Sequence, residues 1–348
     1  MKILLISPKM ERPNGGIAIW TEMYLEGCAK ADVSCTVVNT APIGKRALNG
    51  SAGRSASDEL VRTRKIFQDL KKSLKERYDA VHLNTSCGTF GVIRDYLIAK
   101  KIRRKLPKTK LVVHFHCDIP FQVRNKISKR YLAKLVSLCD DKLVLCENSR
   151  KYLLKNFHVE SEMVPNFINE AVILDTPKPI AETLRTAFFV GRVSRAKGAE
   201  EMFALAKRLP NVSFRLAGAI PEEVATWEKP DNLYLLGPLP HDEVFAEMDQ
   251  ADLFIFPSHS EGFSVALMEA MARGLPTIAT NVGAAENMLE DRGGIIVDVG
   301  DVDAMVRAFD SMQTRPSREH ASLWVWEKVK QNYTTESVMA LLKRIYGV

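Results

Sequence analysis

The sequence predicts an α/β fold with two domains, each built on a parallel sheet. The chain has 348 residues, which is enough for two domains of ordinary size. Short apolar runs alternate with longer helical patterns along both halves, as in strand–helix–strand units. A proline-containing polar stretch at residues 174–184 predicts a linker between the halves. Each half is therefore expected to fold around its own sheet.

Composition narrows the class of protein. Hydrophobic residues make up 46% of the chain and charged residues 26%, as in soluble globular proteins. No apolar run approaches the roughly 20 residues that span a bilayer, and the apolar run at residues 3–6 is too short for a signal peptide. The six cysteines are scattered without a C-x-x-C pair, which predicts buried thiols in a reducing cytoplasm rather than a zinc site.

The charge of the chain is unevenly distributed. The net charge is +7, yet residues 1–170 hold 31 Lys and Arg against 17 Asp and Glu, and the remainder holds 18 against 25. Such an excess of positive charge in one half predicts that this half meets an anionic partner.

The first half opens with a strand at residues 3–6, the turn Gly15-Gly16 and a helix at residues 17–29. Glycines directly before a helix let the backbone approach a phosphate or a sugar closely, although a plain turn also explains them. Further strands are expected at residues 35–38 and 80–83, a polar loop at 41–57, and basic helices at 58–77 and 91–106.

A fourth apolar run, from Lys110, ends in His114, His116 and Asp118. Ligands bind off the carboxyl edge of parallel sheets, so these side chains are candidates for a site. On a strand both histidines share one face and no third ligand follows, so a metal is not predicted. A hydrogen-bonded core imidazole is the alternative interpretation of His116.

Residues 121–137 show an amphipathic helical pattern with Val123, Ile127, Tyr131 and Leu135 on one face. Five cations lie between them. This pattern suits a helix on an anionic membrane surface, and it equally suits an ordinary surface helix with a solvated face. The strand at residues 142–146 is expected to be the last of the first domain.

The second half begins with a strand at residues 186–190, followed by Gly191-Arg192 and Lys197-Gly198 before a helix. Two cations five residues apart at this point can bind a diphosphate. The Arg192 guanidinium can donate two parallel hydrogen bonds to it, and the Lys197 ammonium can attract it by its charge. The alternative is a pair of exposed basic residues in a turn. Later strands are expected at residues 214–218 and 233–237, and a helix at 243–249.

The most informative stretch runs from Ser258 to Pro276. A strand at residues 253–256 leads into a turn-rich loop, and Ser264 is a good N-cap for a helix at residues 265–272 that Gly274 and Pro276 end. The next strand covers residues 277–280. The helix is apolar almost all round, which predicts burial, and its single charge is Glu269.

Glu269 inside the helix and Glu261 in the preceding loop flank the helix N-terminus, which suits a phosphate. A nucleotide sugar has a matching layout, with hydroxyl groups on both sides of a diphosphate. The alternative is that Glu269 is a core carboxylate bonded to backbone and Glu261 a solvated loop charge.

These residues resemble the E-x7-E motif of retaining GT-B glycosyltransferases of family 4: Glu261, Gly262, Phe263, Glu269 and then Gly274 and Pro276. Gly191-Arg192 and Lys197-Gly198 resemble the Gly-Arg…Lys-Gly motif of the same family. The resemblance covers nearly the whole chain and is most specific over residues 186–286. Pro165-Asn166-Phe167-Ile168-Asn169 departs from the pattern of that family at Phe167 and Asn169.

The resemblance implies a GT-B fold, with two Rossmann-like domains facing across a cleft and a C-terminal helix that crosses back to the first domain. The expected domains are residues 1–170 completed by 325–348, and residues 171–324, which would bind the donor. It implies catalytic roles for Arg192, Lys197, Glu261 and His116. The implied donor-binding residues are Gly15, Gly16, Gly191, Gly262, Phe263, Ser264, Val265 and Glu269.

The implied activity is that of a hexosyltransferase-type enzyme, with a nucleotide diphosphate sugar as donor and no metal cofactor. The basic first half favours a lipid-linked glycan as acceptor, in cell-surface polysaccharide assembly, with peripheral contact to the inner face of the plasma membrane. A soluble small-molecule acceptor is the alternative. Nucleic-acid binding is not expected, because no aromatic residues interleave with the basic runs. A GT-B epimerase or phosphorylase fits the two motifs poorly.

Overall fold

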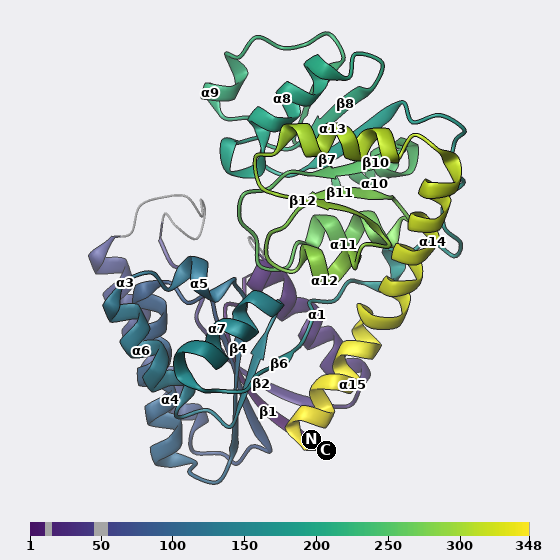
Figure 1. The fold of residues 1–348 in the computed structure, drawn as a ribbon. Helices are drawn as coiled ribbons and strands as arrows, with labels where there is room; N and C mark the ends of the chain where they lie inside the picture. Colours follow the sequence, from purple (N-terminus) through teal and green to yellow (C-terminus); the bar gives the residue numbers. More distant parts are fainter. Residues whose placement is uncertain (11–15, 45–54, 348) are drawn as a thin grey trace. The chain divides into compact units, whose positions relative to one another are not determined.

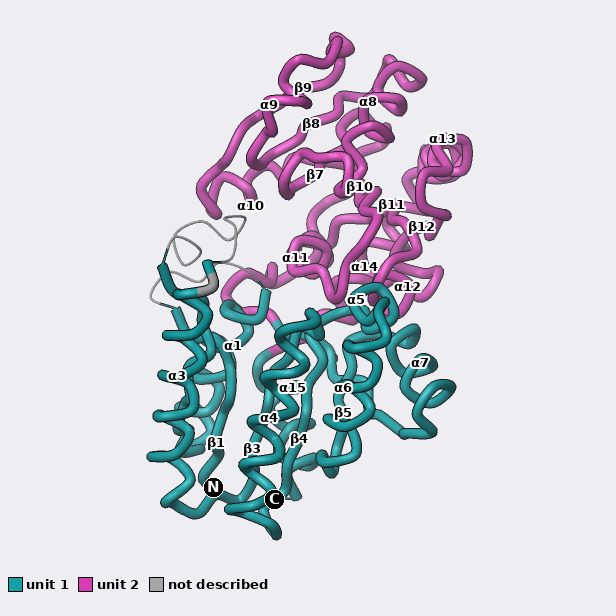
Figure 2. The backbone as a smooth tube through the Cα atoms, turned by 90° about the vertical axis from the view of Figure 1, so that its left-hand side faces the viewer, with its two compact units in different colours: residues 1–167, 335–348 teal, residues 168–334 magenta. Residues whose placement is uncertain are grey.

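The computed structural model describes residues 1–348 except 11–15, 45–54 and 348, and divides into two compact units. Unit 1 comprises residues 1–167 and 335–348, and unit 2 comprises residues 168–334 (Figure 2). Each unit contains one parallel six-stranded sheet. The predicted α/β class with two sheets is confirmed. No helix in the described part of the chain combines the length and the apolar character needed to cross a membrane.

The sheet of unit 1 has the strand order β2-β1-β3-β4-β5-β6. Its strands are β1 (Lys2–Ser7), β2 (Ser34–Asn39), β3 (Ala80–Thr85), β4 (Lys110–Phe115), β5 (Asp141–Val144) and β6 (Glu162–Met163). The helices are α1 (Gly16–Lys30), α3 (Ala56–Ser73), α4 (Thr89–Lys105), α5 (Ile119–Gln122), α6 (Lys126–Val136), α7 (Glu147–Phe157) and α15 (Thr335–Tyr346) (Figure 1).

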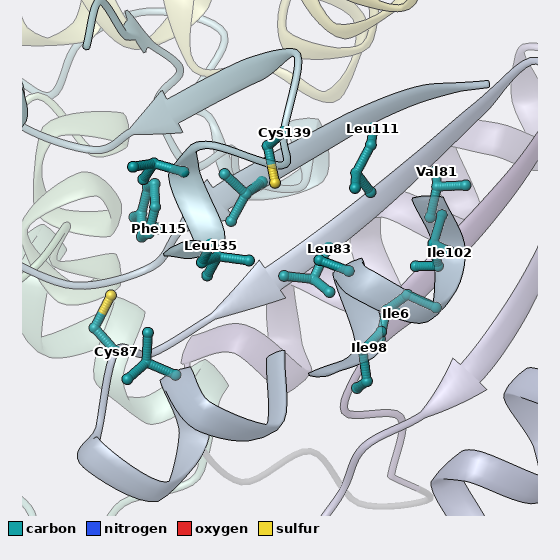
Figure 3. Packing of buried hydrophobic residues seen from close by; sticks show 14 of the residues in the cluster. Ile6, Val81, Leu83, Cys87, Ile98, Ile102, Leu111, Phe115, Leu135 and Cys139 are labelled. Carbon is teal, nitrogen blue, oxygen red and sulfur yellow. The ribbon is translucent and has the colours of Figure 1, made fainter. Parts of the chain in front are cut away.

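Alternating side chains of the strands in unit 1 enter two cores, one on each face of the sheet. Leu4 and Ile6 of β1 belong to one cluster, together with residues of α3, α4 and α6 (Figure 3). Ile3 and Leu5 belong to the other cluster, together with residues of α1 and α15. Successive strand residues point to opposite faces of the sheet. When both faces are covered, every residue of a strand is buried, and the strand is a continuous apolar run in the sequence.

The sheet of unit 2 has the order β12-β11-β10-β7-β8-β9. Its strands are β7 (Thr186–Val190), β8 (Ser213–Ala217), β9 (Leu233–Gly237), β10 (Leu253–Phe256), β11 (Thr277–Thr280) and β12 (Gly294–Val297). The helices are α8 (Ala199–Arg208), α9 (Glu222–Ala225), α10 (His241–Gln250), α11 (Val265–Ala272), α12 (Ala285–Leu289), α13 (Val302–Ser311) and α14 (Arg315–Asn332), and short 3₁₀ turns lie at Glu170–Val172 (η1) and Arg195–Lys197 (η2).

Two predictions about local structure were wrong. The strand near residue 142 is not the last of its sheet, because the short β6 pairs with it in parallel. The helix predicted over residues 121–137 is broken into α5 and α6, and Asn125 caps α6 by accepting a hydrogen bond from the Ser128 amide at 2.8 Å. Leu132 and Leu135 of α6 pack into the core, whereas Ile127 near its start is 57% exposed.

Candidate active site

The strand order of unit 2 reverses between β7 and β10. β8 and β9 lie beyond β7 on one side, and β11 and β12 lie beyond β10 on the other. In parallel α/β sheets the loops that leave such a pair of strands diverge and form the ligand crevice at the carboxyl edge. The loop with Arg192 and Lys197 leaves β7, and the loop with Glu261 leaves β10.

These two loops are held directly against each other. The His259 amide donates to the carbonyl of Ala196 at 3.0 Å. Gly198 has φ +79°, and a Cβ there would lie 2.3 Å from the carbonyl oxygen of Pro257, so only glycine fits this contact. The His259 imidazole also donates through Nε2 to the buried carboxylate of Glu201 at 2.7 Å. These contacts keep the basic loop and the acidic loop in one fixed arrangement.

Helix α11 begins at Val265 and ends at Ala272, as the sequence predicts. Ser264 caps it, because its Oγ accepts a hydrogen bond from the Leu267 amide at 3.2 Å. Gly274 ends it with φ +69°. The first turn of an α-helix has amides without partners inside the helix, and these amides suit an anion. The structure thus sets a capped helix N-terminus directly after the acidic loop.

The backbone before α11 is supported from both sides. The Gly262 carbonyl accepts a hydrogen bond from the Ala284 amide at 2.9 Å. The Phe263 ring is buried, and its centroid lies 5.4 Å from that of Tyr333 in a perpendicular contact. The aromatic side chain therefore anchors the loop in the core, which leaves the backbone of this residue as the part that can meet a ligand.

Lys197 and Glu261 form an ion pair between the two loops. Ser258, which is fully buried, also donates its hydroxyl to Glu261 Oε1 at 3.1 Å. The Glu261 side chain is 16% exposed and that of Lys197 is 34% exposed. Glu261 is therefore not a solvated loop charge. The Lys197 ammonium and the Ser258 hydroxyl fix the Glu261 carboxylate in place, and the Lys197 side chain remains partly exposed.

Glu269 has a partner that the sequence analysis did not assign. His241, the first residue of α10, donates through Nε2 to Glu269 Oε1 at 2.8 Å. The Glu269 side chain is 13% exposed, and that of His241 is 65% exposed. Glu269 is thus a nearly buried carboxylate bonded on one side by an imidazole that reaches into solvent. Pro238 and Pro240 directly before His241 were the sequence signal that a helix, and with it this side chain, begins here.

The hydrogen bond to Glu269 raises the pKa of His241 above its usual value near 6.5. The ion pair therefore stabilises the fold fully below pH 6.5, and this contribution is lost as the pH rises through the raised pKa. We expect His241→Gln to lower the melting temperature at pH 5.5 and to change it less at pH 8.5. The effect on the free energy of unfolding should stay below about 1 kcal/mol, because the imidazole is mostly exposed. Scanning calorimetry of both proteins at the two pH values checks this, and an equal difference at both would contradict it.

Arg192 differs from the other cations of this region. It is exposed, and it makes no hydrogen bond or ion pair with any residue that the structure describes. Arg195, three residues later, pairs with Glu200 and Glu223, and its guanidinium lies 5.0 Å from the centroid of the Trp227 ring. Of these two neighbouring arginines, Arg192 is the one whose five donors are not engaged by the protein.

Unit 1 carries the remaining predicted residues. Gly16 is the first residue of α1 and is exposed, and Gly15 lies outside the described residues. His116 follows β4 directly, and its imidazole Nε2 lies 3.0 Å from Asn84 Oδ1. Burial lowers the pKa of His116 to about 3, so its imidazole is neutral at physiological pH. His114 is fully buried beneath it, with the two ring centroids 4.1 Å apart.

Among the described residues, no group of three or more His, Cys, Asp or Glu side chains is placed to hold a metal ion. Glu261, in the loop after β10, is bonded to a lysine, and Glu269, in α11, is bonded to a histidine.

Comparison with known proteins agrees with this architecture. Residues 174–322 match the family model described as glycosyl transferases group 1. The chain is 26% identical over 261 residues to 2-deoxystreptamine N-acetyl-D-glucosaminyltransferase of Niallia circulans, and the match covers 66% of each protein. The fold is similar to that of sucrose-phosphate synthase from Thermosynechococcus elongatus, with a TM-score of 0.77 at 17% identity over 99% of this chain and 98% of that one. It is also similar to Anabaena HepE in complex with UDP-glucose, with a TM-score of 0.69 at 13% identity over the full length of both.

Two Rossmann-like parallel sheets, with a C-terminal helix that packs on the first of them, define the class of this protein as the GT-B fold of glycosyltransferases. The region that matches the family model of glycosyl transferases group 1, residues 174–322, makes up most of unit 2. The chain spans 66% of the length of the Niallia circulans relative.

Proposed function

We propose that this protein transfers a sugar, with retention of anomeric configuration, from a nucleoside diphosphate sugar to an acceptor hydroxyl group. The observation that carries the proposal is the arrangement at the carboxyl edge of β7 and β10. There the unengaged guanidinium of Arg192, the Lys197–Glu261 ion pair and the capped N-terminus of α11 belong to two loops in direct contact. The similarity to HepE, whose structure holds UDP-glucose, supports this type of donor.

In the proposed reaction, negative charge develops on the phosphate oxygen that leaves the sugar. Arg192, Lys197 and the first-turn amides near Ser264 and Val265 would stabilise this charge, because fixed donors need no reorganisation as the bond breaks. The carboxylate of Glu269 would accept hydrogen bonds from the ribose hydroxyls, and Glu261 would hold the sugar. Because cations of the chain neutralise the diphosphate, we propose that no metal ion is needed. The leaving phosphate would itself take the proton of the acceptor that attacks on the same face.

Slow hydrolysis of UDP-, GDP- and ADP-sugars by the full-length protein tests this proposal in the presence of EDTA. We expect release of a nucleoside diphosphate from at least one donor, without inhibition by EDTA. The sugar product observed by proton NMR at early times should keep the anomeric configuration of the donor. Hydrolysis of no donor would contradict the proposed activity, and an inverted product would contradict retention.

For the acceptor we propose a lipid-linked glycan at the cytoplasmic face of the membrane, in cell-surface polysaccharide assembly. Among the exposed large apolar side chains of unit 1 are Phe90, which is 69% exposed, Phe121, which is 42% exposed, and Ile127, which is 57% exposed. The hydrogen bond from Asn125 Nδ2 to Thr89 Oγ1, at 2.9 Å, joins the segments that carry them. The Arg124 guanidinium lies 4.3 Å from the Phe121 ring centroid, and α6, which carries Ile127, also carries the exposed cations Lys126, Lys129 and Arg130.

Exposed apolar side chains on segments that also carry exposed cations suit the boundary between lipid headgroups and acyl chains. We expect the protein to cosediment with vesicles that contain phosphatidylglycerol, and this binding to weaken steeply as salt increases. Each cation near such a surface contributes about 1 kcal/mol, so Lys129→Glu with Arg130→Glu should weaken binding roughly 30-fold. The matched control is Lys151→Glu with Lys155→Glu, which makes the same change of charge at exposed positions of a different helix, α7.

Equal weakening by both double variants would mean that binding depends on the net charge of the protein and not on the surface around Phe121. Absence of vesicle binding at low salt would contradict the proposed membrane contact. In that case a soluble acceptor becomes the better proposal. It is favoured by the similarity to an enzyme named for 2-deoxystreptamine, a small soluble molecule.

A further inference from the structure

A chain of hydrogen bonds crosses the interior of unit 1 and ends at His116. Tyr24 OH lies 2.9 Å from Tyr346 OH of the C-terminal helix, and Tyr346 OH lies 2.7 Å from His82 Nδ1. His82 Nε2 and His116 Nε2 each lie 3.0 Å from the same atom, Asn84 Oδ1. With the exception of His116, which is partly exposed, these side chains are buried.

A side branch of hydrogen bonds, from Asn84 to Ser7 and Thr21, fixes the orientation of the Asn84 amide. Asn84 Nδ2 lies 2.9 Å from Ser7 Oγ, Ser7 Oγ lies 2.6 Å from Thr21 Oγ1, and Thr21 donates to the Ile17 carbonyl at 2.8 Å. Each of these three hydrogen bonds needs one hydrogen between its two heavy atoms. The Ile17 carbonyl has no hydrogen to donate, and the hydroxyls of Ser7 and Thr21 donate one each. The third proton must come from Asn84, so its NH₂ group faces Ser7 and its oxygen faces the two histidines.

This orientation of the Asn84 amide determines which ring nitrogen of His82 and of His116 carries a hydrogen. An amide oxygen only accepts hydrogen bonds, so His82 Nε2 and His116 Nε2 must both carry a hydrogen. Burial keeps both rings neutral, because it lowers the pKa of each to about 3. A neutral imidazole has a single N–H, so Nδ1 of each ring carries a lone pair. Tyr346 then donates to His82 Nδ1, and Tyr24 donates to Tyr346.

We propose that Asn84 is a positioning residue that holds His116 in the Nε2–H tautomer and presents Nδ1 as a hydrogen-bond acceptor. His116 Nδ1 has no hydrogen-bond partner among the described residues. The group that it recognises therefore has to donate a hydrogen, as a sugar hydroxyl does and as a carbonyl or ether oxygen cannot. That the recognised group belongs to a sugar rests on the proposed function. The tautomer itself does not depend on it.

Long-range proton–nitrogen NMR of the full-length protein with ¹⁵N-labelled histidine tests the tautomer without any substrate. The His116 signals are assigned from the spectrum of His116→Gln. We expect His116 Nε2 to show the shift of a protonated nitrogen and Nδ1 that of an unprotonated one at pH 7.5. A protonated Nδ1 with an unprotonated Nε2 in the wild type would overturn the proposal.

Variants of Asn84 distinguish a role in setting the His116 tautomer from a role in stabilising the fold alone. Asp at this position can only accept, so Asn84→Asp should keep the Nε2–H tautomer of His116. Asn84→Leu removes the acceptor and should let the Nδ1–H form appear, with a fall in donor hydrolysis of roughly 10-fold or more. Tyr24→Phe is the control, because it removes only the far end of the chain and should leave the His116 signals unchanged.

If Asn84→Leu does not fold, the wild-type and Asn84→Asp spectra still decide the question. Loss of the Nε2–H form in Asn84→Asp, or its full retention in a folded Asn84→Leu protein, would overturn the positioning role. Failure of the proposed function would appear differently, as absence of donor hydrolysis in a wild-type protein whose His116 shows the expected tautomer.

Discussion

Replacing Lys197 by alanine should lower turnover by about 10²-fold or more and should also destabilise unit 2. The loss of turnover follows from removing a fixed cation that faces the developing charge on the leaving phosphate. The loss of stability has a separate cause. Lys197 neutralises Glu261, whose side chain is only 16% exposed, and without it the carboxylate keeps only the hydrogen bond from Ser258. We expect a cost of about 1–2 kcal/mol in the free energy of unfolding.

A second substitution separates the two effects. Gln at position 261 carries no charge and can still accept the hydrogen bond from Ser258, so Lys197→Ala with Glu261→Gln should recover most of the lost stability. Turnover should remain low in the double variant, because the cation is still missing. The wild type, both single variants and the double variant form a double-mutant cycle. Urea unfolding and donor hydrolysis are measured on all four proteins. Recovery of turnover together with stability would show that Lys197 acts only by holding Glu261.

Replacing Arg192 by alanine should lower turnover by about 10²-fold as well, but with no measurable change in stability. The side chain is exposed and engages none of the described residues, so its removal breaks no contact within the protein. Its planar fork of donors suits a diphosphate, and a lysine at this position should restore only part of the activity. Donor hydrolysis and the melting temperature of Arg192→Ala and Arg192→Lys check both statements.

Arg195 supplies a matched control for Arg192. It carries the same charge three residues away, but its guanidinium pairs with Glu200 and Glu223. Arg195→Ala should therefore leave turnover within about twofold of the wild type and change stability by less than about 1 kcal/mol. Equal losses of turnover in Arg192→Ala and Arg195→Ala would mean that general positive charge, rather than a placed guanidinium, supports activity.

The parts of the fold that the sequence predicts well are those with strong local signals. α11 has the predicted ends because Ser264 caps its start and Gly274 adopts the left-handed conformation at its end. The strands that the sequence predicts are short apolar runs between turn residues, and their positions agree with the structure to within about two residues.

The elements that sequence analysis missed have weak or misleading patterns. β6 is only two residues long, Glu162–Met163, and both residues are exposed, so no apolar run marks it. α14 was not predicted because its buried stripe includes Arg318 and Ser322 among Ala321, Val325 and Val329. Arg318 is nevertheless fully buried, and it donates to the Met312 carbonyl at 2.9 Å. Tertiary contacts, and not local hydrophobicity, keep this helix in place.

The sequence indicated Lys197, Glu261 and Glu269 as candidates for one site, but not which side chains they pair with. Lys197 and Glu261 are 64 positions apart, and His241 and Glu269 are 28 apart. Such pairings depend on the order of the strands, since β7 and β10 become neighbours only when the sheet forms. For the same reason Asn84 could not be assigned to His116, because β3 and β4 bring them together across the sheet.

The central claim is that the loops after β7 and β10 bind a nucleoside diphosphate. Calorimetric titration of UDP, GDP and ADP into the full-length protein tests it directly, with EDTA present. We predict that at least one of them binds, that Arg192→Ala weakens its binding by 10-fold or more, and that Arg195→Ala does not. Binding of none of the three, or identical binding by the wild type and Arg192→Ala, would contradict the claim.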